Sequence, residues 1–195
     1  MSDSPDRADD PDAGEQGDVI AATRHWLEVA VIGLNLCPFA KAVHVKRQIR
    51  YVLTQAGSDS ELLAVLRDEL SLLAKTDANE IDTTLLIHPQ ALTDFIDYTA
   101  FLRQADWLLR KQGLEGILQI ASFHPAYEFA GSDPDDIENC SNRSPFPMLH
   151  LLREDSIERA VAAFPDAGEI YQRNIETLRG LGHAGWRRLF MQEPV

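Results

Sequence analysis

The chain has few cysteines and no long apolar run, and each shortage excludes a class of protein. Only Cys37 and Cys140 occur among 195 residues, too few for a disulfide-stabilised scaffold, so we expect free thiols. No stretch of about 18 uninterrupted apolar residues is present, and the N-terminus is acidic where a signal peptide is basic and then apolar. We therefore predict neither a membrane span nor a signal peptide, and expect a cytoplasmic protein with no membrane partner.

Positive charge is also scarce. The formal net charge is -13, with 31 acidic residues against 18 Lys and Arg. Binding to a nucleic-acid backbone depends on concentrated Lys and Arg, so we expect no nucleic-acid partner. Neither GxxxxGK[ST] nor GxGxxG follows an expected strand, which gives no support for nucleotide binding by those routes. The identity of any cofactor or protein partner stays unknown from the sequence.

Much of the negative charge lies at the N-terminus. Residues 1–18 contain seven acidic residues and only one base, Arg7, and they are rich in Asp, Pro, Gly and Ser. Such a segment cannot bury enough apolar surface to offset the entropy lost on ordering. We predict a disordered acidic tail over residues 1–17 and a single domain over residues 18–195.

The apolar spacing of the remainder predicts an alternation of helices and strands. We expect helices at about 18–36, 58–75, 92–112, 156–164 and 169–181, strands at 43–53, 83–87, 116–123 and 148–152, and a short packed segment at 186–191. Asp18 is the expected N-cap of the first helix and Pro38 its expected end. The prediction is an α/β fold: a layered single domain with a small mixed or mostly parallel sheet of about four strands, covered by helices.

A long polar stretch between the last two expected strands carries most of the reactive side chains. Residues 119–154 include two His, six acidic residues, four Pro and an Asn-Arg-Ser triplet. A loop of this length inside a compact domain is usually functional or disordered, and its aromatic residues and prolines favour order. We therefore expect a long, ordered, functional loop before the last strand.

Two histidines follow expected strands directly. His88 and His124 each stand between a strand and a proline. Ligand sites in open α/β sheets form at the carboxyl ends of strands, so both imidazoles are expected to reach one crevice. His150 alternates with Leu149 and Leu151 and is expected to point into the same crevice. The alternative is that each imidazole caps its strand by hydrogen bonding to local backbone.

Cys37 and the histidines suggest two further chemistries. Cys37 and His124 are a possible thiol and base pair, although a helix C-terminus at Cys37 would oppose thiolate formation. The three histidines are also potential metal ligands, but no CxxC, HExxH or HxxxH spacing identifies a metal. The acidic run that begins at Asp133-Pro134 is better explained as a cap than as a divalent-cation site.

The triplet Asn142-Arg143-Ser144 has the donors of an anion site. A guanidinium flanked by amide and hydroxyl groups can hold a carboxylate or phosphate through two parallel hydrogen bonds. Glu154 would continue the polar rim of this site. The alternative is that Arg143 pairs with an acidic residue nearby, for which Glu128, Asp136 and Glu154 are the candidates.

Several of these segments match together. The strings NLCPFA (35–40), LLIHP (85–89), GLEGILQIASFHPAYEFAG (113–131) and NRSPFPMLHLLRE (142–154) resemble a bacterial family of domains of unknown function, numbered fourteen-fifteen, over about residues 18–190. The resemblance implies no activity, and the family pattern has Thr where this chain has Cys140. The positions that match the pattern are Cys37, Pro38, His88, His124, Asn142, Arg143, Ser144, His150 and Glu154.

The leading hypothesis is an enzyme that acts on a small anionic metabolite. Arg143 and Asn142, with Ser144 and Glu154, would bind the anion, and His124 would be the general base or a metal ligand. His88 and His150 would assist, and Cys37 is the candidate nucleophile. Two alternatives remain: a non-catalytic module that binds a small molecule or protein in the same crevice, and a hydrogen-bond network that only holds the loop.

Overall fold

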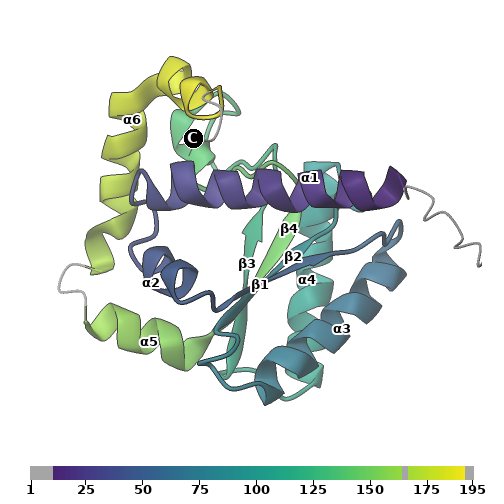
Figure 1. Cartoon of the computed structure of the whole chain (residues 1–195). Coiled ribbons are helices and arrows are strands. Elements are labelled where there is room, and N and C mark those ends of the chain that lie inside the picture. The colour runs from purple at the N-terminus through teal and green to yellow at the C-terminus, as the bar shows by residue number, and fades with distance from the viewer. Residues whose placement is uncertain (1–10, 164–166, 192–195) are drawn as a thin grey trace, which may run out of the picture.

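A four-stranded mixed sheet forms the centre of the molecule (Figure 1). The computed structural model describes residues 11–163 and 167–191. Its strands are β1 (Ile49–Leu53), β2 (Thr83–Ile87), β3 (Leu118–Phe123) and β4 (Met148–Arg153), in the spatial order β1-β2-β4-β3. β1 and β2 are parallel, whereas β4 is antiparallel to both β2 and β3. The predicted α/β domain with a mixed sheet of about four strands, covered by helices, is confirmed.

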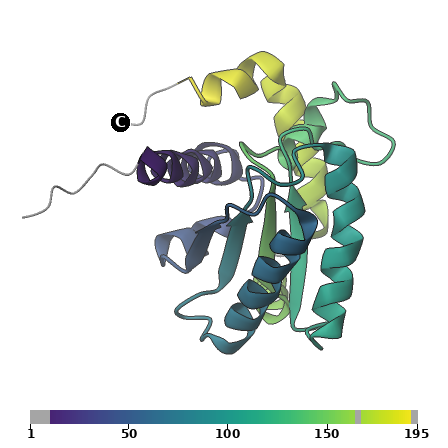
Figure 2. The same ribbon diagram turned by 90° about the vertical axis from the view of Figure 1, so that its right-hand side faces the viewer.

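Helices cover both faces of this sheet. They are α1 (Pro11–Trp26), α2 (Ala40–Val45), α3 (Asp59–Lys75), α4 (Phe95–Lys111), α5 (Glu154–Ala162) and α6 (Ile170–Leu189), with a π-helix at Leu27–Ile32 and 3-10 turns at Ile137–Ser141 and Ala167–Glu169. Figure 2 shows α3 and α4 on one side of the sheet and α1 on the other. None of the helices in the described part of the chain combines the length and apolar content needed to cross a bilayer.

The alternation of side chains along the strands builds two cores. Leu86, Leu149 and Leu151 face α3 and α4, whose leucines and aromatic residues they contact. Leu85 and Met148 face α1 and the π-helix instead. β2 is buried along its whole length because it lies between β1 and β4 and is covered on both faces, as its apolar sequence TTLLI predicts.

The expected helix boundaries hold well for α3 and α4. Ser58 caps α3 by accepting a hydrogen bond from the Glu61 backbone N–H, and Asp94 caps α4 in the same way. Gly113 follows α4 with a φ of +69°, the left-handed conformation that glycine adopts most easily. These elements combine a clear apolar stripe with a defined start and end.

The N-terminal third differs from prediction. α1 begins at Pro11, so Asp18 is inside a helix and does not cap it, and residues 11–17 of the expected tail are helical. Residues 1–10 lie outside the described residues. The helix continues as a π-helix to Ile32, and the expected strand at 43–53 is a short helix, α2, followed by β1 from Ile49.

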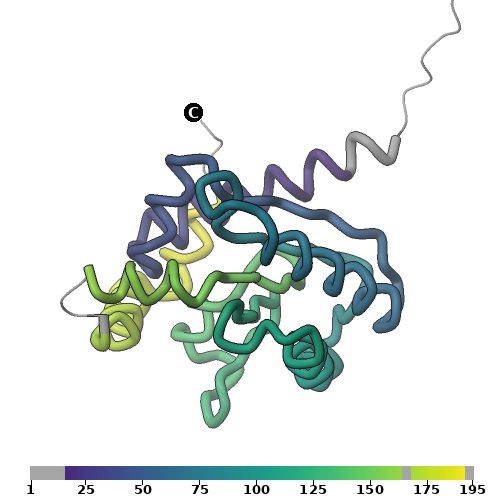
Figure 3. The backbone as a smooth tube through the Cα atoms, turned by 90° about the horizontal axis from the view of Figure 1, so that it is seen from below, coloured from purple at the N-terminus to yellow at the C-terminus, as the bar shows by residue number. Residues whose placement is uncertain are grey.

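The loop between β3 and β4, residues 124–147, stands out from the body of the domain (Figures 2 and 3). Its 3-10 turn packs Ile137 and Cys140 against Leu36 and against Leu178 of α6. The side chain of Trp26 holds the loop from the other side, because its Nε1–H donates to the Arg143 carbonyl oxygen at 2.9 Å. The loop is therefore anchored by the π-helix region and by the C-terminal helix.

Candidate functional site

The structure brings His88 and His124 together at one end of the sheet. β2 and β3 run in the same direction with β4 between them, so both histidines follow the carboxyl ends of their strands. The ring of Tyr98, from α4, lies between them, with ring centroids 6.0 Å from His88 and 5.1 Å from His124. Both histidines are buried, at 0% and 1% exposure, so they share a closed cluster and not an open crevice.

Both imidazoles hold the connection between β2 and α4. The His124 Nδ1 atom accepts a hydrogen bond from the Ala126 N–H, so Nε2 carries the proton and donates to the Leu92 carbonyl oxygen at 3.1 Å. His88 Nδ1–H donates to the preceding carbonyl oxygen, that of Ala91, at 2.9 Å. Two histidines thus bind consecutive carbonyls, and Leu92 is held at a φ of +55°.

Both rings are neutral in this arrangement. Burial lowers the pKa of His88 to about 4 and also lowers the pKa of His124, because a charged imidazole loses its hydration there. His88 Nε2 is buried and has no hydrogen-bond partner in the part of the chain that the structure describes. Protonation of His124 would break its bond from Ala126, which also favours the neutral form.

His150 and Cys37 lie on the opposite face of the sheet. His150 stands opposite Leu85 in the middle of β4, and its Nε2 is 2.6 Å from the Thr83 Oγ1. Burial lowers its pKa to about 4. Cys37 packs in the core beneath α1, and burial raises the pKa of its thiol, which disfavours the thiolate. Neither side chain joins the cluster of His88 and His124.

The Asn142-Arg143-Ser144 triplet binds backbone carbonyls. Arg143 Nε donates to the Tyr127 carbonyl oxygen at 3.1 Å and Nη2 to that of Pro134 at 2.7 Å. Asn142 Nδ2 donates to the Ser122 carbonyl oxygen and Ser144 Oγ to that of Phe146. Among the described residues, Arg143 forms no ion pair with the acidic residues that were the expected alternative. These side chains hold the loop, and their role in ligand binding stays a prediction.

Asn139 organises the same loop and was missed in the sequence. It is fully buried, and its Oδ1 accepts hydrogen bonds from the Phe129 N–H and the Ser132 hydroxyl. Its Nδ2 donates to the Asp133 carbonyl oxygen. The Asp133 carboxylate accepts from the Asp135 N–H and closes a turn, but it caps no helix, because the 3-10 turn that follows begins at Ile137.

Two further expectations concern the opposite end of the sheet and metal binding. Glu154 begins α5 beside Arg153, whose partner in β3 is Leu118, so it lies at the end of β3 remote from His124. In the part of the chain that the structure describes, no three His, Cys, Asp or Glu side chains are grouped as metal ligands would be. The structure therefore groups His88 with His124 but leaves His150, Cys37 and Glu154 elsewhere.

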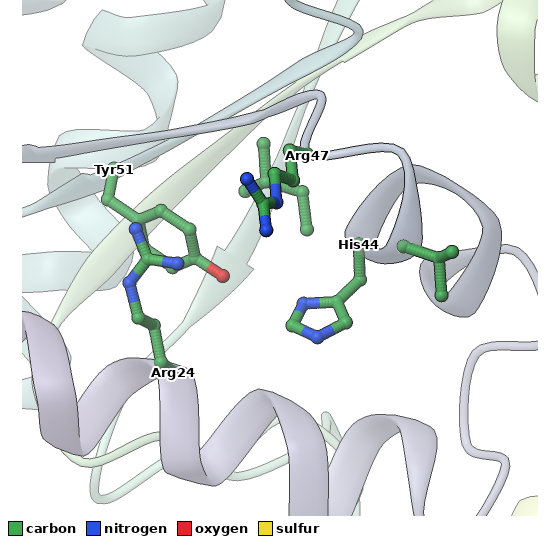
Figure 4. Close-up of a pocket in the computed structure, with 6 residues that line it drawn as sticks. Arg24, His44, Arg47 and Tyr51 are labelled. Carbon is green, nitrogen blue, oxygen red and sulfur yellow. The ribbon is translucent and has the colours of Figure 1, made fainter.

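A second region combines an open pocket with several basic side chains. A pocket of about 380 Å³ lies between α1, α2 and β1. Figure 4 shows Arg24, His44, Arg47 and Tyr51 directed towards this common space. The residues that line it are Arg24, His44, Val45, Arg47, Ile49 and Tyr51.

The two arginines of the pocket have no acidic partners within the described ranges. Arg24 lies over the Tyr51 ring, with its guanidinium carbon 4.1 Å from the ring centroid. Within the described ranges, neither Arg24 nor Arg47 has a carboxylate within 4.0 Å. Arg50, on the opposite face of the same strand, instead binds Glu69 through two hydrogen bonds of 2.8 and 3.0 Å. One face of β1 thus carries an arginine paired with a carboxylate, and the other face lies beside two arginines that have no such partner among the described residues.

The pocket also holds a phenol and an imidazole. The Tyr51 hydroxyl is buried and has no hydrogen-bond partner among the described residues, and burial raises the pKa of Tyr51, so it remains a neutral donor. His44 Nε2 lies 3.4 Å from a Glu28 carboxylate oxygen in the π-helix. Arg47 has a φ of +58°, a conformation that costs a non-glycine residue about 1 kcal/mol or more.

The sequence held a signal for this pocket. Residues 44–50 read HVKRQIR, a basic run in a chain with a net charge of -13. A local excess of positive charge in an acidic chain is a candidate anion site. The run alone does not identify the pocket, because its alternation also suits a strand and because Arg24 reaches the pocket from a separate helix.

Comparison with known proteins identifies the family. A family model described as "Protein of unknown function (DUF1415)" matches residues 18–188, nearly the whole of the described chain. No curated protein and no solved structure matches. The match covers all four strands, both histidines of the buried cluster and all residues that line the pocket. The chain belongs to this family, whose members share a domain of unknown function.

Proposed function

We propose that this protein binds a small anionic metabolite and acts on it, in the pocket between α1, α2 and β1. The observation that carries the proposal is the convergence on one space of about 380 Å³ of two guanidinium groups that have no acidic partner among the described residues. Guanidinium groups bind carboxylate and phosphate through parallel hydrogen bonds, so two of them directed at one cavity, with no carboxylate within 4.0 Å among the described residues, suit a ligand of opposite charge. The ligand class is the one expected from the sequence, and the location is new.

The size of the pocket supports a small ligand. Binding sites for small molecules commonly have volumes of about 300 to 1,000 Å³ and combine apolar walls with a few directed polar groups. Val45 and Ile49 supply apolar surface here, while Arg24, Arg47 and Tyr51 supply donors. A compact metabolite suits these dimensions.

His44 is the group proposed to perform chemistry. Its imidazole lines the pocket, and a carboxylate oxygen of Glu28 lies 3.4 Å from its Nε2 atom. A carboxylate that orients an imidazole is the usual arrangement of a general base with its supporting group. The π-helix that carries Glu28 is also a kind of distortion that occurs frequently at functional sites.

A non-catalytic binding module is the second candidate. It is favoured by the exposure of Arg24 and Arg47, because an open site does not exclude water from the reacting groups. Both candidates share the anion site and differ only in turnover. The cytoplasmic location expected from the sequence stays a prediction.

The anion site is tested by calorimetric titration of the purified chain with small carboxylates and phosphates. The double variant Arg24→Gln/Arg47→Gln should weaken binding by at least about tenfold, since each charge-assisted hydrogen bond contributes roughly 1.5 to 3 kcal/mol. The matched control is Arg103→Gln/Arg110→Gln, which removes two exposed arginines of α4. Equal affinities in the wild type and the pocket variant would refute the proposed site.

Turnover is tested with the ligands that bind. Each is incubated with the wild type and with His44→Gln, and the mixture is followed by proton and phosphorus NMR. An enzyme with His44 as base should convert a ligand that the variant binds within a few-fold of wild type but leaves unchanged. Recovery of every bound ligand intact from the wild type would leave the binding module as the function.

A further inference from the structure

We infer that the anion is the phosphate group of a small phosphorylated metabolite, and this rests on the anion site proposed above. The donors come from three directions: Arg24 from α1, Arg47 from the turn after α2, and the Tyr51 hydroxyl from β1. A carboxylate is planar, carries one charge and has two oxygens in one plane. A phosphate monoester is tetrahedral, has three terminal oxygens and carries a charge of about -1.5 to -2 at pH 7.

The charge of the pocket agrees with a doubly charged group. Two guanidinium groups remain charged at any physiological pH and have no carboxylate within 4.0 Å among the described residues. A single carboxylate would leave one of these charges uncompensated, whereas a phosphate dianion compensates both. Arginine is also the side chain that matches phosphate geometry most closely, through pairs of parallel N–H bonds.

The Tyr51 hydroxyl supplies the donor that distinguishes this site from a surface pair of arginines. Its oxygen is buried, has no partner in the described chain and lies beside the pocket. A buried hydroxyl without a partner costs free energy, so an oxygen of the ligand that accepts its proton recovers that cost. The third phosphate oxygen is the acceptor that we assign to it.

The volume that a phosphate group would leave unfilled has room for an organic part of the ligand. A pocket of about 380 Å³ offers more space than the five heavy atoms of a phosphate group occupy, since roughly 10 to 15 Å³ of such space already holds one water molecule. Val45, which is 70% exposed, and Ile49 offer an apolar wall for this part. Glu28 beside His44 disfavours a second negative group at that end. The ligand therefore carries its charge at one end and an uncharged body at the other.

The experiment compares four probes on the purified full-length chain at one pH and ionic strength: propyl phosphate, inorganic phosphate, propyl sulfate and butyrate. Propyl sulfate keeps the tetrahedral shape with a single charge, and butyrate keeps a carboxylate on a similar body. We expect propyl phosphate to bind at least tenfold more tightly than propyl sulfate and butyrate, and several-fold more tightly than inorganic phosphate. Calorimetry measures all four.

Variants assign the binding to these residues. Arg24→Gln and Arg47→Gln should each weaken propyl phosphate at least tenfold, and Tyr51→Phe several-fold, while Arg110→Gln leaves the affinity unchanged. Thermal unfolding by circular dichroism verifies that each variant is folded. Tyr51→Phe is the variant that separates a built phosphate site from diffuse attraction, because it changes no charge.

The outcomes separate this inference from the proposed function. Butyrate bound as tightly as propyl phosphate, with both lost in the arginine variants, would preserve the anion site and overturn the phosphate assignment. Inorganic phosphate bound as tightly as propyl phosphate would overturn the inference that the ligand carries an organic part. No binding of any probe, at concentrations up to tens of millimolar, would overturn the phosphate assignment, and failure of the wider carboxylate and phosphate titration would overturn the anion site itself.

Discussion

Two regions of this molecule carry histidine and arginine side chains close together, and they differ in where the polar atoms of those side chains are directed. In the loop between β3 and β4, Arg143 and His124 donate to backbone carbonyls of the same molecule. In the pocket beneath α1, the charged edges of Arg24 and Arg47 meet no acceptor among the described residues. The same residue types therefore serve structure in one place and leave binding capacity unused in the other.

The difference has an energetic meaning. Satisfied buried polar groups hold a loop that has little apolar core of its own, and losing one partner leaves the other unpaired at a cost of roughly 1 to 3 kcal/mol. The guanidinium groups around the pocket form no ion pair in the described chain, so they contribute less to folding than the loop residues do and are available to a ligand. Removing residues of the loop should thus reduce stability, and removing residues of the pocket should reduce binding.

The largest expected effect is the loss of Asn139. Asn139→Ala removes three hydrogen bonds inside the loop and leaves the Phe129 N–H, the Ser132 hydroxyl and the Asp133 carbonyl without this partner. We expect the free energy of unfolding to fall by about 3 kcal/mol, measured by urea denaturation. The control, Asn79→Ala, alters an exposed turn and should change it by less than about 0.5 kcal/mol. Similar small losses for both variants would contradict a loop held by its polar network.

The second effect is a loss of stability in acid. The pKa of His88 is about 4 in the folded protein against 6.5 for the free side chain, so between these values the unfolded chain binds a proton that the folded one does not. The contribution of neutral His88 to the free energy of unfolding is fully present above pH 6.5. It is lost as the pH falls towards 4, at about 1.4 kcal/mol per pH unit. His88→Asn keeps a donor near the Ala91 carbonyl and should show a slope that is shallower by this amount. Parallel slopes for the two proteins, from urea denaturation at several pH values, would show that His88 titrates normally.

The elements that sequence predicted well are those whose signal is local. β2 is a short apolar run, and α3 and α4 each combine a stripe of leucines or aromatic residues with a capping side chain at the first turn. The predicted start of β1 was wrong because the loose alternation of apolar residues after Val43 suits a strand and a short helix equally well. The turn between α2 and β1 includes Arg47, which has a positive φ. This conformation is uncommon for arginine and cannot be predicted from the residue type.

The candidate site was predictable in its residue types and only in part in its geometry. A histidine between a strand and a proline indicates a position at a strand end, and His88 and His124 do meet there. Whether their ring nitrogens are available to a ligand depends on backbone carbonyls that only the tertiary structure brings near, such as that of Leu92 for His124. The pocket was missed because Arg24 and Tyr51 are distant in sequence and each resembles an ordinary surface residue.

A third variant tests the division between the regions directly. Arg143→Lys retains the charge but cannot donate to two separated carbonyls as the guanidinium does. We expect the free energy of unfolding to fall by about 1 to 2 kcal/mol and the affinity for small anions to remain within twofold of wild type. Denaturation and calorimetry provide the two measurements. A tenfold loss of affinity would move the anion site to Arg143, as the sequence alone had suggested.

The smallest expected effect has the opposite sign. Arg47 holds a φ of +58°, which glycine adopts without the steric cost that a side chain incurs, and its side chain has no ion pair in the described chain to offset that cost. Arg47→Gly should therefore raise the free energy of unfolding by about 0.5 to 1 kcal/mol while it weakens anion binding. Lys46→Gly is the matched control: Lys46 has a φ of -76°, so the added chain freedom should lower stability instead. If both variants lose stability to the same extent, the Arg47 side chain contributes to folding. The pocket would then resemble the loop, because its arginine would serve stability as well as binding.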